Sequence, residues 1–447
     1  MLDKLSITLE LNNLAGALRY PRKNEGCVFY QGSIEEQVSI IAQKIVPYGK
    51  VALFYTKSTF EKIGRKVSAC LKKQSIKIVN VLLPKKIKSV ASCLEVFNLP
   101  EDVRMVFAFD KELFDVAKYF CAINGLQCGL VIKNPNFFNS LSNKILANVG
   151  TSPEYVDAFT IKHVILADEL FDSNDSYNGY LYARLVSGLS FIVDYRISST
   201  LKRKPINKRA FNLIKSGVTG GLSVMKYSLS ERKTALIYFN LILEIANVLS
   251  LGEIINGGAM CYSERLFNAL NGIDDGIDDG NINHLENGYG YILLKLCKKI
   301  LGVYEIVLSS DNLTVYETCD YTSRVEFLTS LTGGEELSYL KNFKQQIDLI
   351  SCSQKEIDKI KAQLYGQVKS FYLYLKASIN TYHAIGGKDF IGAKTPCDKR
   401  AKKAENSAPN PLNSPLAIKY AGDEIGALNG MTLARELGVT DNPAFCD

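Results

Sequence analysis

Short apolar runs of strand length alternate with amphipathic segments through roughly the first 170 residues of the chain. A strand, a helix and a second strand in that order form a parallel pair with a right-handed crossover. The pattern therefore predicts an α/β domain with a mostly parallel sheet. We predict strands at 51–55, 76–83, 103–109, 128–132 and 163–168, with helices at 59–73 and 112–123.

From Tyr180 onward, apolar residues recur every three or four positions, which is the spacing of amphipathic helices. After residue 386 the chain becomes rich in proline, lysine and small polar residues, which is typical of a flexible tail. We therefore predict an α/β domain at 1–175, an all-helical domain at 176–385 and a tail at 386–447. Helices are predicted at 180–200, 208–216, 230–251, 263–270 and 288–301.

The composition is that of an ordinary globular protein: 447 residues, 47% hydrophobic and 22% charged. The net charge of +7 is not gathered into an arginine-rich stripe with interleaved aromatic residues, so solvated lysines are favoured over nucleic-acid binding. The sequence has neither the pattern of a signal peptide nor an uncharged apolar stretch of about 18 residues. We expect a cytoplasmic protein that binds neither nucleic acid nor membrane.

The eleven cysteines form no C-x-x-C pair, and most lie in apolar stretches. This arrangement favours reduced, buried thiols and disfavours a zinc site built from cysteines.

Several motifs occur in a consistent order between residues 25 and 380. They are the strand and helix beginning at Val28, the strand–helix–strand at 49–84, V-I-L-A-D-E-L at 164–170, D-Y-R at 194–196, S-E-R-L-F-N-A-L at 263–270 and N-H-L-E-N-G-Y-G at 283–290. In this order and spacing the chain resembles the iron-containing alcohol dehydrogenase and dehydroquinate synthase group, closest to its glycerol-1-phosphate dehydrogenase branch. The resemblance implies a Rossmann-like domain followed by a helical domain, with NAD(P) and a metal ion held by one Asp and two His.

The departures from the family pattern fall on positions that carry its chemistry. Where the family has G-G-G-S, which lets backbone N–H groups approach the dinucleotide pyrophosphate, this chain has Phe109-Asp110-Lys111-Glu112. Side chains would fill the space that phosphates need, and the acidic ones would repel them. The family's Asp and Lys further along this motif are retained as Asp115 and Lys118, which are the candidate cofactor contacts.

The family's substrate loop, of the form V-P-T-A-P-S-x-D, is also missing. Lys133-Asn134-Pro135-Asn136 occupies its place. We expect the segment from there to His163 to be too short for the β-hairpin that usually follows.

The resemblance places the family's three metal ligands at or near Arg184, at Arg265 and at His284. Arginine offers no lone pair to a metal, and two cations repel a divalent ion. Zinc or iron is therefore not expected, and no cofactor is expected unless NAD(P) still binds. Arg184 and Arg265 are either anion-binding residues or internal ion-pair partners, and His284 is either structural or a proton donor.

Two glycine-rich segments have ordinary interpretations. The acidic repeat at 272–280 lacks the distal Glu of a helix-flanked calcium loop and is interpreted as a solvated loop. Gly217-Val218-Thr219-Gly220-Gly221 lacks the lysine of a phosphate-binding loop and is predicted to be a turn between helices.

Three hypotheses for function remain open at this point. The first is a degenerate dehydrogenase-like protein with a binding or regulatory role, in a homo-oligomer or a dimer with an active relative. The second is an NAD(P)-dependent oxidoreductase of a polyol or polyol phosphate with a rewired, metal-independent site. In it His284 donates the proton, and either Lys118 or the two arginines, Arg184 and Arg265, orient the substrate. The third is a protein that binds a small phosphorylated ligand or other anion through Arg184 and Arg265.

The substitution of arginine for ligands makes a testable prediction about metal content. We expect the purified protein to hold well below one equivalent of zinc or iron by elemental mass spectrometry, because the ligand positions carry permanent positive charge. One bound equivalent together with NAD(P)-linked turnover would contradict the first hypothesis.

Overall fold

The structure is a computed structural model of the 447-residue chain. It describes residues 4–15, 27–44, 49–84, 99–201 (apart from 139, 143, 150–151, 158–160 and 174), 205–250, 288–301 (apart from 296 and 299–300) and 354–389.

The chain divides into two compact units. The first unit contains Met1–Asn174 and Ser228–Leu251, and the second contains Asp175–Tyr227 and Gly252–Asp447. The predicted α/β half followed by a helical half is confirmed as a fold class. The domain boundaries predicted at 175 and 385 stay predictions.

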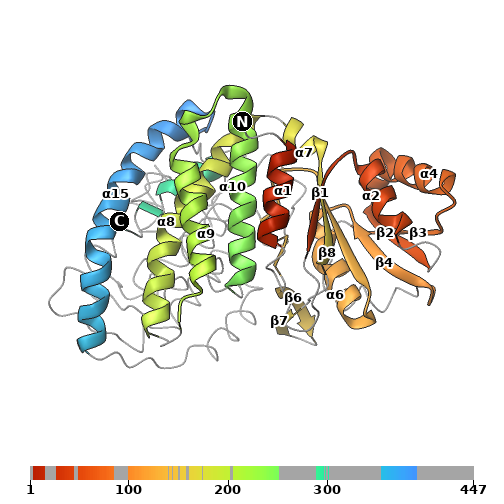
Figure 1. Ribbon diagram of the computed structural model, residues 1–447, viewed down its shortest axis with the longest axis horizontal. Helices are drawn as coiled ribbons and strands as arrows, with labels where there is room; N and C mark the ends of the chain where they lie inside the picture. The colour runs from red at the N-terminus through yellow and green to blue at the C-terminus, as the bar shows by residue number, and fades with distance from the viewer. Residues whose placement is uncertain are drawn as a thin grey trace, which may run out of the picture. The chain divides into compact units, whose positions relative to one another are not determined.

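Six parallel strands form the sheet of the first unit, in the order β1-β8-β5-β4-β2-β3 (Figure 1). Each of the strands predicted from apolar runs is present, and β1 adds a further one. The bounds are β1 Val28–Gly32, β2 Lys50–Thr56, β3 Ile78–Leu83, β4 Val103–Ala108, β5 Gln127–Ile132 and β8 Ile161–Ala167. Strand β2 is buried from Val51 to Thr56, which explains its continuous apolar run.

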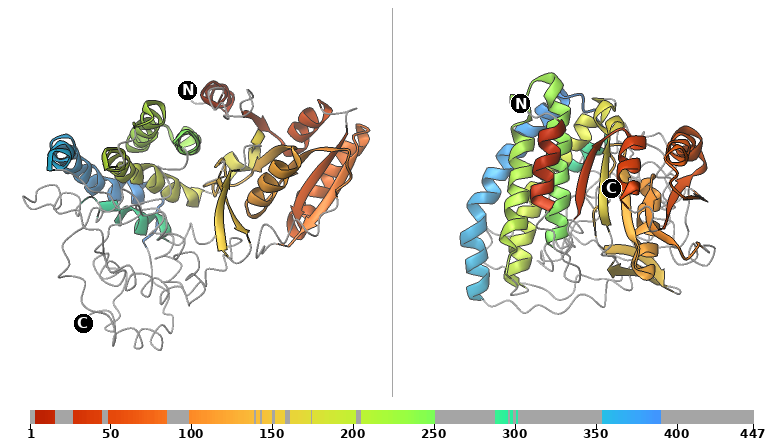
Figure 2. Two further views of the ribbon diagram at one scale, coloured as in Figure 1. Left: turned by 90° about the horizontal axis from the view of Figure 1, so that it is seen from below. Right: turned by 45° about the vertical axis from the view of Figure 1, so that its right-hand side comes forward.

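Helices cover the sheet on both faces (Figure 2). Alternate residues of β2, such as Leu53 and Tyr55, share a core with Val38 of α2 and Val67 of α4. Phe54, which points the other way, packs on Phe120 of α6. The bounds are α2 Ile34–Gln43, α3 Lys57–Thr59, η1 Phe60–Gly64, α4 Arg65–Lys73, η2 Lys111–Leu113, α6 Phe114–Asn124 and α7 Asp168–Asp172.

Two helices far apart in the sequence complete the first unit. Helix α1 (Lys4–Ala15) lies beside the edge strand β1, where the Asn12 side chain both donates to the Phe29 carbonyl and accepts from its N–H. The side-chain amide of Asn12 thereby satisfies the backbone N–H and carbonyl of Phe29 at the edge of the sheet. Helix α10 (Leu229–Leu249) contacts α1, and Tyr238 donates its hydroxyl proton to the Glu10 carboxylate.

The expectation that no hairpin precedes His163 was wrong. Strands β6 (Lys144–Val149) and β7 (Ser152–Asp157) form an antiparallel pair. A hairpin needs only a two-residue connection, so twelve paired residues fit into a segment that looked too short.

The second unit is helical in its described part, with α8 Asn178–Leu201, α9 Lys208–Leu222, α15 Gln354–Ala384, and the short turns η3 Asp175–Tyr177 and η4 Val224–Lys226. The predicted turn at 217–221 was wrong, because α9 runs through it. A β-carbon added at Gly221 would lie 2.6 Å from the Leu185 Cβ, and one at Gly188 would lie 2.6 Å from Val218 Cγ2. The glycines therefore permit close packing of α8 on α9. The predicted helix at 263–270, the acidic repeat and the tail lie outside the described residues.

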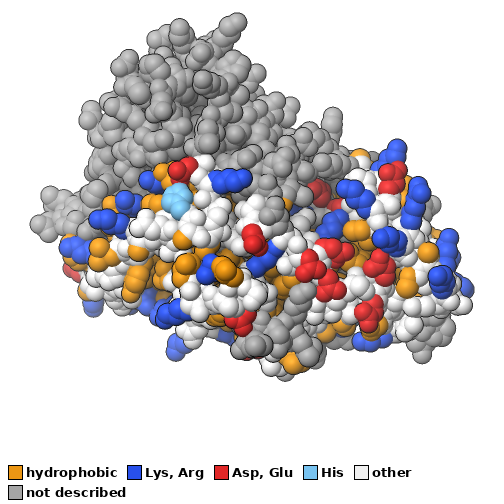
Figure 3. Space-filling model, turned by 90° about the horizontal axis from the view of Figure 1, so that it is seen from above, with side chains coloured by type: hydrophobic (Ala, Val, Ile, Leu, Met, Phe, Trp, Pro, Cys, Tyr) orange, Lys and Arg blue, Asp and Glu red, His pale blue; other side chains and the backbone are white. Residues whose placement is uncertain are grey.

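The charge distribution on the described surface and the length of the described helices leave the partner predictions untested. Figure 3 shows Lys and Arg side chains of the described residues lying among acidic and apolar ones on the face seen from above. Within the part of the chain that the structure describes, every helix is too short or too polar to cross a membrane. Binding to nucleic acid remains untested.

The α8–α9 contact predicts a position-specific effect of an added methyl group. We expect Gly221→Ala to lower the free energy of unfolding by about 1–3 kcal/mol, because overpacking forces the two helices apart. The matched control is Gly366→Ala in α15, which meets no atom within 4 Å and should stabilise by about 0.5–1 kcal/mol. Urea denaturation followed by circular dichroism measures both. Equal stability of Gly221→Ala and the parent would contradict the close packing.

Candidate functional site

The direction in which successive strands are added to the sheet reverses at β2. From β2 the chain adds β3 on one side, then crosses to β4 on the other side and continues through β5 to β8. The connections after β2 and β4 therefore run over opposite faces of the sheet, with α4 on one face and α6 on the other. Ligands of open parallel sheets bind at such a switch point.

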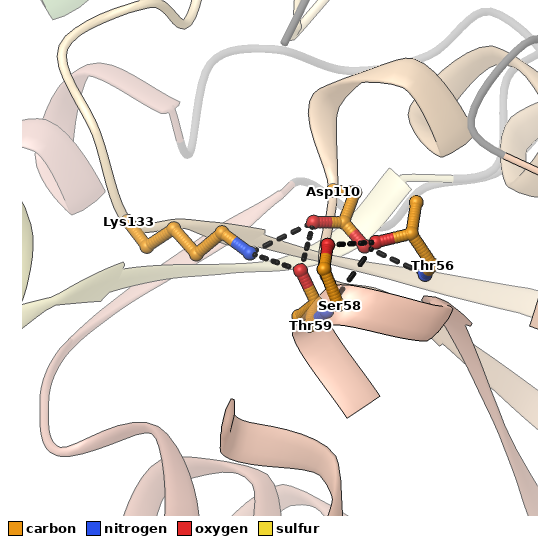
Figure 4. Close-up of polar contacts among 5 residues, drawn as sticks. All are labelled: Thr56, Ser58, Thr59, Asp110 and Lys133. Carbon is orange, nitrogen blue, oxygen red and sulfur yellow. Dashed lines mark hydrogen bonds and ion pairs between the residues drawn. The ribbon is translucent and has the colours of Figure 1, made fainter. Parts of the chain in front are cut away.

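Five polar residues gather at this switch point (Figure 4). Thr56 ends β2, and Ser58 and Thr59 follow it in the first helical turn. Asp110 comes two residues after β4, and Lys133 directly follows β5. Because the carboxyl ends of parallel strands meet at one edge, residues separated by more than 70 positions come together.

The Asp110 carboxylate is the centre of the cluster. Its Oδ2 accepts a hydrogen bond from the Thr56 N–H at 2.8 Å. Its Oδ1 accepts from the Thr59 hydroxyl at 2.5 Å and from the Lys133 ammonium at 2.8 Å. The Asp110 side chain is 8% exposed and that of Lys133 is 20% exposed. This is a nearly buried ion pair in which both carboxylate oxygens are used.

The start of the helical segment adds to the stabilisation of this anion. Residues 57–73 run without a break through α3, η1 and α4. Thr56 caps them, since its hydroxyl accepts from the Thr59 N–H at 3.4 Å. A carboxylate at this end interacts favourably with the helix dipole. Ser58 is exposed, and its hydroxyl lies 3.2 Å from that of Thr56.

These contacts decide the protonation state of Asp110. Burial by itself raises the pKa of the carboxyl, but the Lys133 ammonium and the hydrogen bonds from Lys133, Thr59 and Thr56 together outweigh it. The net result is a pKa below the ordinary value of an aspartate. Asp110 is therefore a carboxylate at neutral pH.

The rest of the loop after β4 is filled by its own side chains. Phe109 is fully buried and stacks on Tyr55 with ring centroids 4.3 Å apart. The Lys111 ammonium donates to the Asn136 side chain at 2.8 Å, which ties this loop to the one after β5. The space beyond the strand ends is thus occupied by an aromatic ring and two lysine–acceptor contacts from within the chain.

Asp115 and Lys118, the predicted cofactor contacts, bind each other. The Lys118 ammonium is completely buried, 2.6 Å from Asp115 Oδ1 and 3.2 Å from the Ser142 carbonyl. This pair lies within α6 and fixes the segment after β5. Its role in cofactor binding stays a prediction.

The predicted anion and catalytic residues are not assembled by the described structure. Arg184 is 1% exposed within α8, where its carbonyl accepts from the Ser187 hydroxyl. Arg265 and His284 lie outside the described residues. Their proposed roles therefore remain predictions. Within the described part of the chain, no group of three or more His, Cys, Asp or Glu residues is placed to hold a metal.

Among the other buried titratable groups are His163 and several cysteines. His163 Nδ1 lies 3.2 Å from the Tyr30 hydroxyl, and burial together with Lys162 and Lys44 lowers the pKa of the imidazole to about 4. It is therefore neutral at physiological pH. The described cysteines are free thiols, and burial raises the pKa of Cys27 and Cys121. Such thiols are unreactive.

The sequence pattern identified Asp110 only as a residue that repels phosphate, and it missed the partners Thr56, Thr59 and Lys133. A local signal existed, because Thr56, Asp110 and Lys133 each directly follow one of the strands predicted at 51–55, 103–109 and 128–132. What the signal lacked was the strand order that makes β2, β4 and β5 neighbours.

Solved structures similar to this chain include dehydrogenases. A glycerol dehydrogenase from Schizosaccharomyces pombe shares 9% identity with a TM-score of 0.44, over 82% of this chain and 93% of that one. The NADH-dependent butanol dehydrogenase A of Thermotoga maritima shares 13% identity with a TM-score of 0.46, over 93% and 97%. An iron-containing alcohol dehydrogenase of the same organism shares 13% identity with a TM-score of 0.41, over 78% and 97%.

No protein-family model matches the chain, and neither does any curated protein. At these identities and TM-scores, the similarities assign no activity to it.

The depressed pKa of Asp110 predicts how its contribution to stability depends on pH. We expect Asp110→Asn to lower the free energy of unfolding by roughly 1–3 kcal/mol at pH 7, because the Lys133 ammonium loses its counter-charge. A carboxylate whose pKa is lower in the folded state than in the unfolded state stabilises the fold fully at pH values above its unfolded pKa of about 3.9. This stabilisation disappears as the pH falls through the pKa of the folded state. The difference between parent and variant should therefore narrow as the pH is lowered from about 5 to about 2.

Urea denaturation at several pH values measures this difference. The control is Asp102→Asn, whose partner Lys50 lies 3.1 Å away with both side chains partly exposed, at 47% and 31%. We expect that change to cost less than about 1 kcal/mol. Equal effects of the two substitutions, or a difference for Asp110 that does not vary with pH, would contradict the buried ion pair.

Proposed function

We propose that this chain is a dehydrogenase-like protein that does not carry out NAD(P)-linked hydride transfer and has a binding or regulatory role. The observation that carries the proposal is the ionised Asp110 carboxylate at the switch point, hydrogen-bonded to Thr56, Thr59 and Lys133. In dinucleotide-binding sheets, the pyrophosphate occupies the loop after a strand, against backbone N–H groups. Here a negative side chain already uses such an N–H group.

The size of the repulsion supports this proposal. Two unit charges about 4 Å apart repel by about 4 kcal/mol at an effective dielectric constant of about 20, or roughly a thousandfold in affinity. This value is an upper bound for a phosphate beside Asp110, because the Lys133 ammonium, 2.8 Å away, offsets the charge of the carboxylate. The first glycine position of the family's motif is held by Phe109, which is fully buried against Tyr55.

The alternative is a metal-independent oxidoreductase of a polyol or polyol phosphate. It requires Lys118, or Arg184 and Arg265, to orient the substrate. The Lys118 ammonium is buried against Asp115 and Ser142, and Arg184 is 1% exposed within α8. The burial of these two cations supports the non-catalytic proposal. A regulatory role would act through a small phosphorylated ligand, a homo-oligomer or a dimer with an active relative, in the cytoplasm.

Direct titration tests the proposal. We expect the oxidised and reduced forms of NAD and NADP to give no saturable heat in isothermal titration calorimetry up to about 1 mM, because Asp110 and Phe109 occupy the loop after β4. An active glycerol dehydrogenase titrated in parallel is the positive control. Saturable binding of a dinucleotide, together with oxidation of glycerol or glycerol 1-phosphate, would overturn the proposal.

A further inference from the structure

Three hydrogen-bond donors from two strand ends converge on one anion. They are the Thr56 N–H, the Thr59 hydroxyl and the Lys133 ammonium, at 2.5–2.8 Å from the Asp110 oxygens. A backbone N–H group, a hydroxyl and an ammonium are together the donors with which proteins bind phosphate. Only Asp110, of these four residues, contributes negative charge.

The donors also contact one another around the carboxylate. The Lys133 ammonium donates to the Thr59 hydroxyl oxygen at 3.1 Å, while that hydroxyl donates to Asp110. The hydroxyl is therefore oriented toward the anion by the lysine. None of the three donors belongs to the loop after β4.

Solvent reaches the rim of this cluster. Lys57 and Ser58 are exposed, and the Lys133 side chain is 20% exposed. Figure 4 shows Lys133 entering from one side and Thr56, Ser58 and Thr59 from the other, with the Asp110 carboxylate between them. An anion of similar size could thus meet the same donors if that carboxylate were withdrawn.

We propose that Asp110 is an autoinhibitory residue, whose carboxylate occupies from within the chain a site for the phosphate group of a small ligand. The site consists of the Thr56 N–H, the Thr59 hydroxyl and the Lys133 ammonium. A phosphate carries more charge than a carboxylate and has more acceptor oxygens, so it interacts more strongly with the same donors once the internal competitor is removed. The inference rests on the proposed function and deepens it, because it names the ligand class and what blocks it.

The experiment removes the Asp110 carboxylate by substitution and adds inorganic phosphate. Full-length Asp110→Ala is titrated with sodium phosphate, with sodium chloride at equal ionic strength as the blank, and phosphate binding is measured by equilibrium dialysis and thermal shift. We expect the alanine variant to bind phosphate at least tenfold more tightly than the parent. Its melting temperature should rise with phosphate, since a ligand that binds only the folded state stabilises it.

Two further variants locate the phosphate. Asp110→Asn removes the charge but keeps the volume, so its phosphate affinity should lie above that of the parent and below that of Asp110→Ala. Asp110→Ala combined with Lys133→Met removes the ammonium, and its affinity should fall at least tenfold below that of Asp110→Ala. Asp110→Ser replaces the alanine variant if the latter does not fold, since the serine hydroxyl can still accept from the Thr56 N–H.

Several outcomes would overturn the inference. They are a folded alanine or serine variant without phosphate binding, an asparagine variant that binds phosphate as tightly as the alanine variant, and a double variant that keeps the affinity. The result is separable from the test of function. Dinucleotide binding with oxidation of glycerol or glycerol 1-phosphate by the parent would refute the proposed function, whereas absence of phosphate binding by the folded Asp110 variants would refute only this inference.

Discussion

The carboxylate of Asp110 is the interaction on which the carboxyl edge of the sheet depends. It joins the ends of β2, β4 and β5 through one N–H, one hydroxyl and one ammonium. Removing a carboxylate from water is unfavourable, and a buried ion pair offsets that cost only when its remaining lone pairs are satisfied. Here both oxygens are satisfied, and the net effect on Asp110 is a lowered pKa. The position of the loop after β4 follows from these bonds.

The same edge is closed elsewhere by contacts within the chain. Lys111 binds the side chain of Asn136, and Gln31 at the end of β1 donates to Asp168 at 2.7 Å. An open parallel sheet ordinarily presents its carboxyl edge to a ligand. In this chain the side chains of Asp110, Lys133, Lys111 and Asn136 at that edge satisfy one another through hydrogen bonds.

Contacts between residues distant in sequence also define the first unit as a whole. Tyr238 of α10 donates to Glu10 of α1, and Asn12 of α1 completes the hydrogen bonds of Phe29 in β1. A segment that follows two helices of the second unit is thus bound to the start of the chain. In the second unit, Gly188 and Gly221 allow α8 and α9 to approach closely, so small residues set the helix spacing there.

The sequence by itself determined most of the secondary structure. Apolar periodicity is a local property, so the strands around Leu53, Phe107 and Leu130 and the helix at 178–201 follow from short windows of sequence. It also placed Asp110 where a phosphate would have to sit. The tertiary structure decided what depends on contacts between segments distant in sequence: the partners of Asp110 and the packing of α10 on α1. The physical reason is that neighbouring strands are chosen by long-range packing, and periodicity within a segment carries no information about which segment lies beside it.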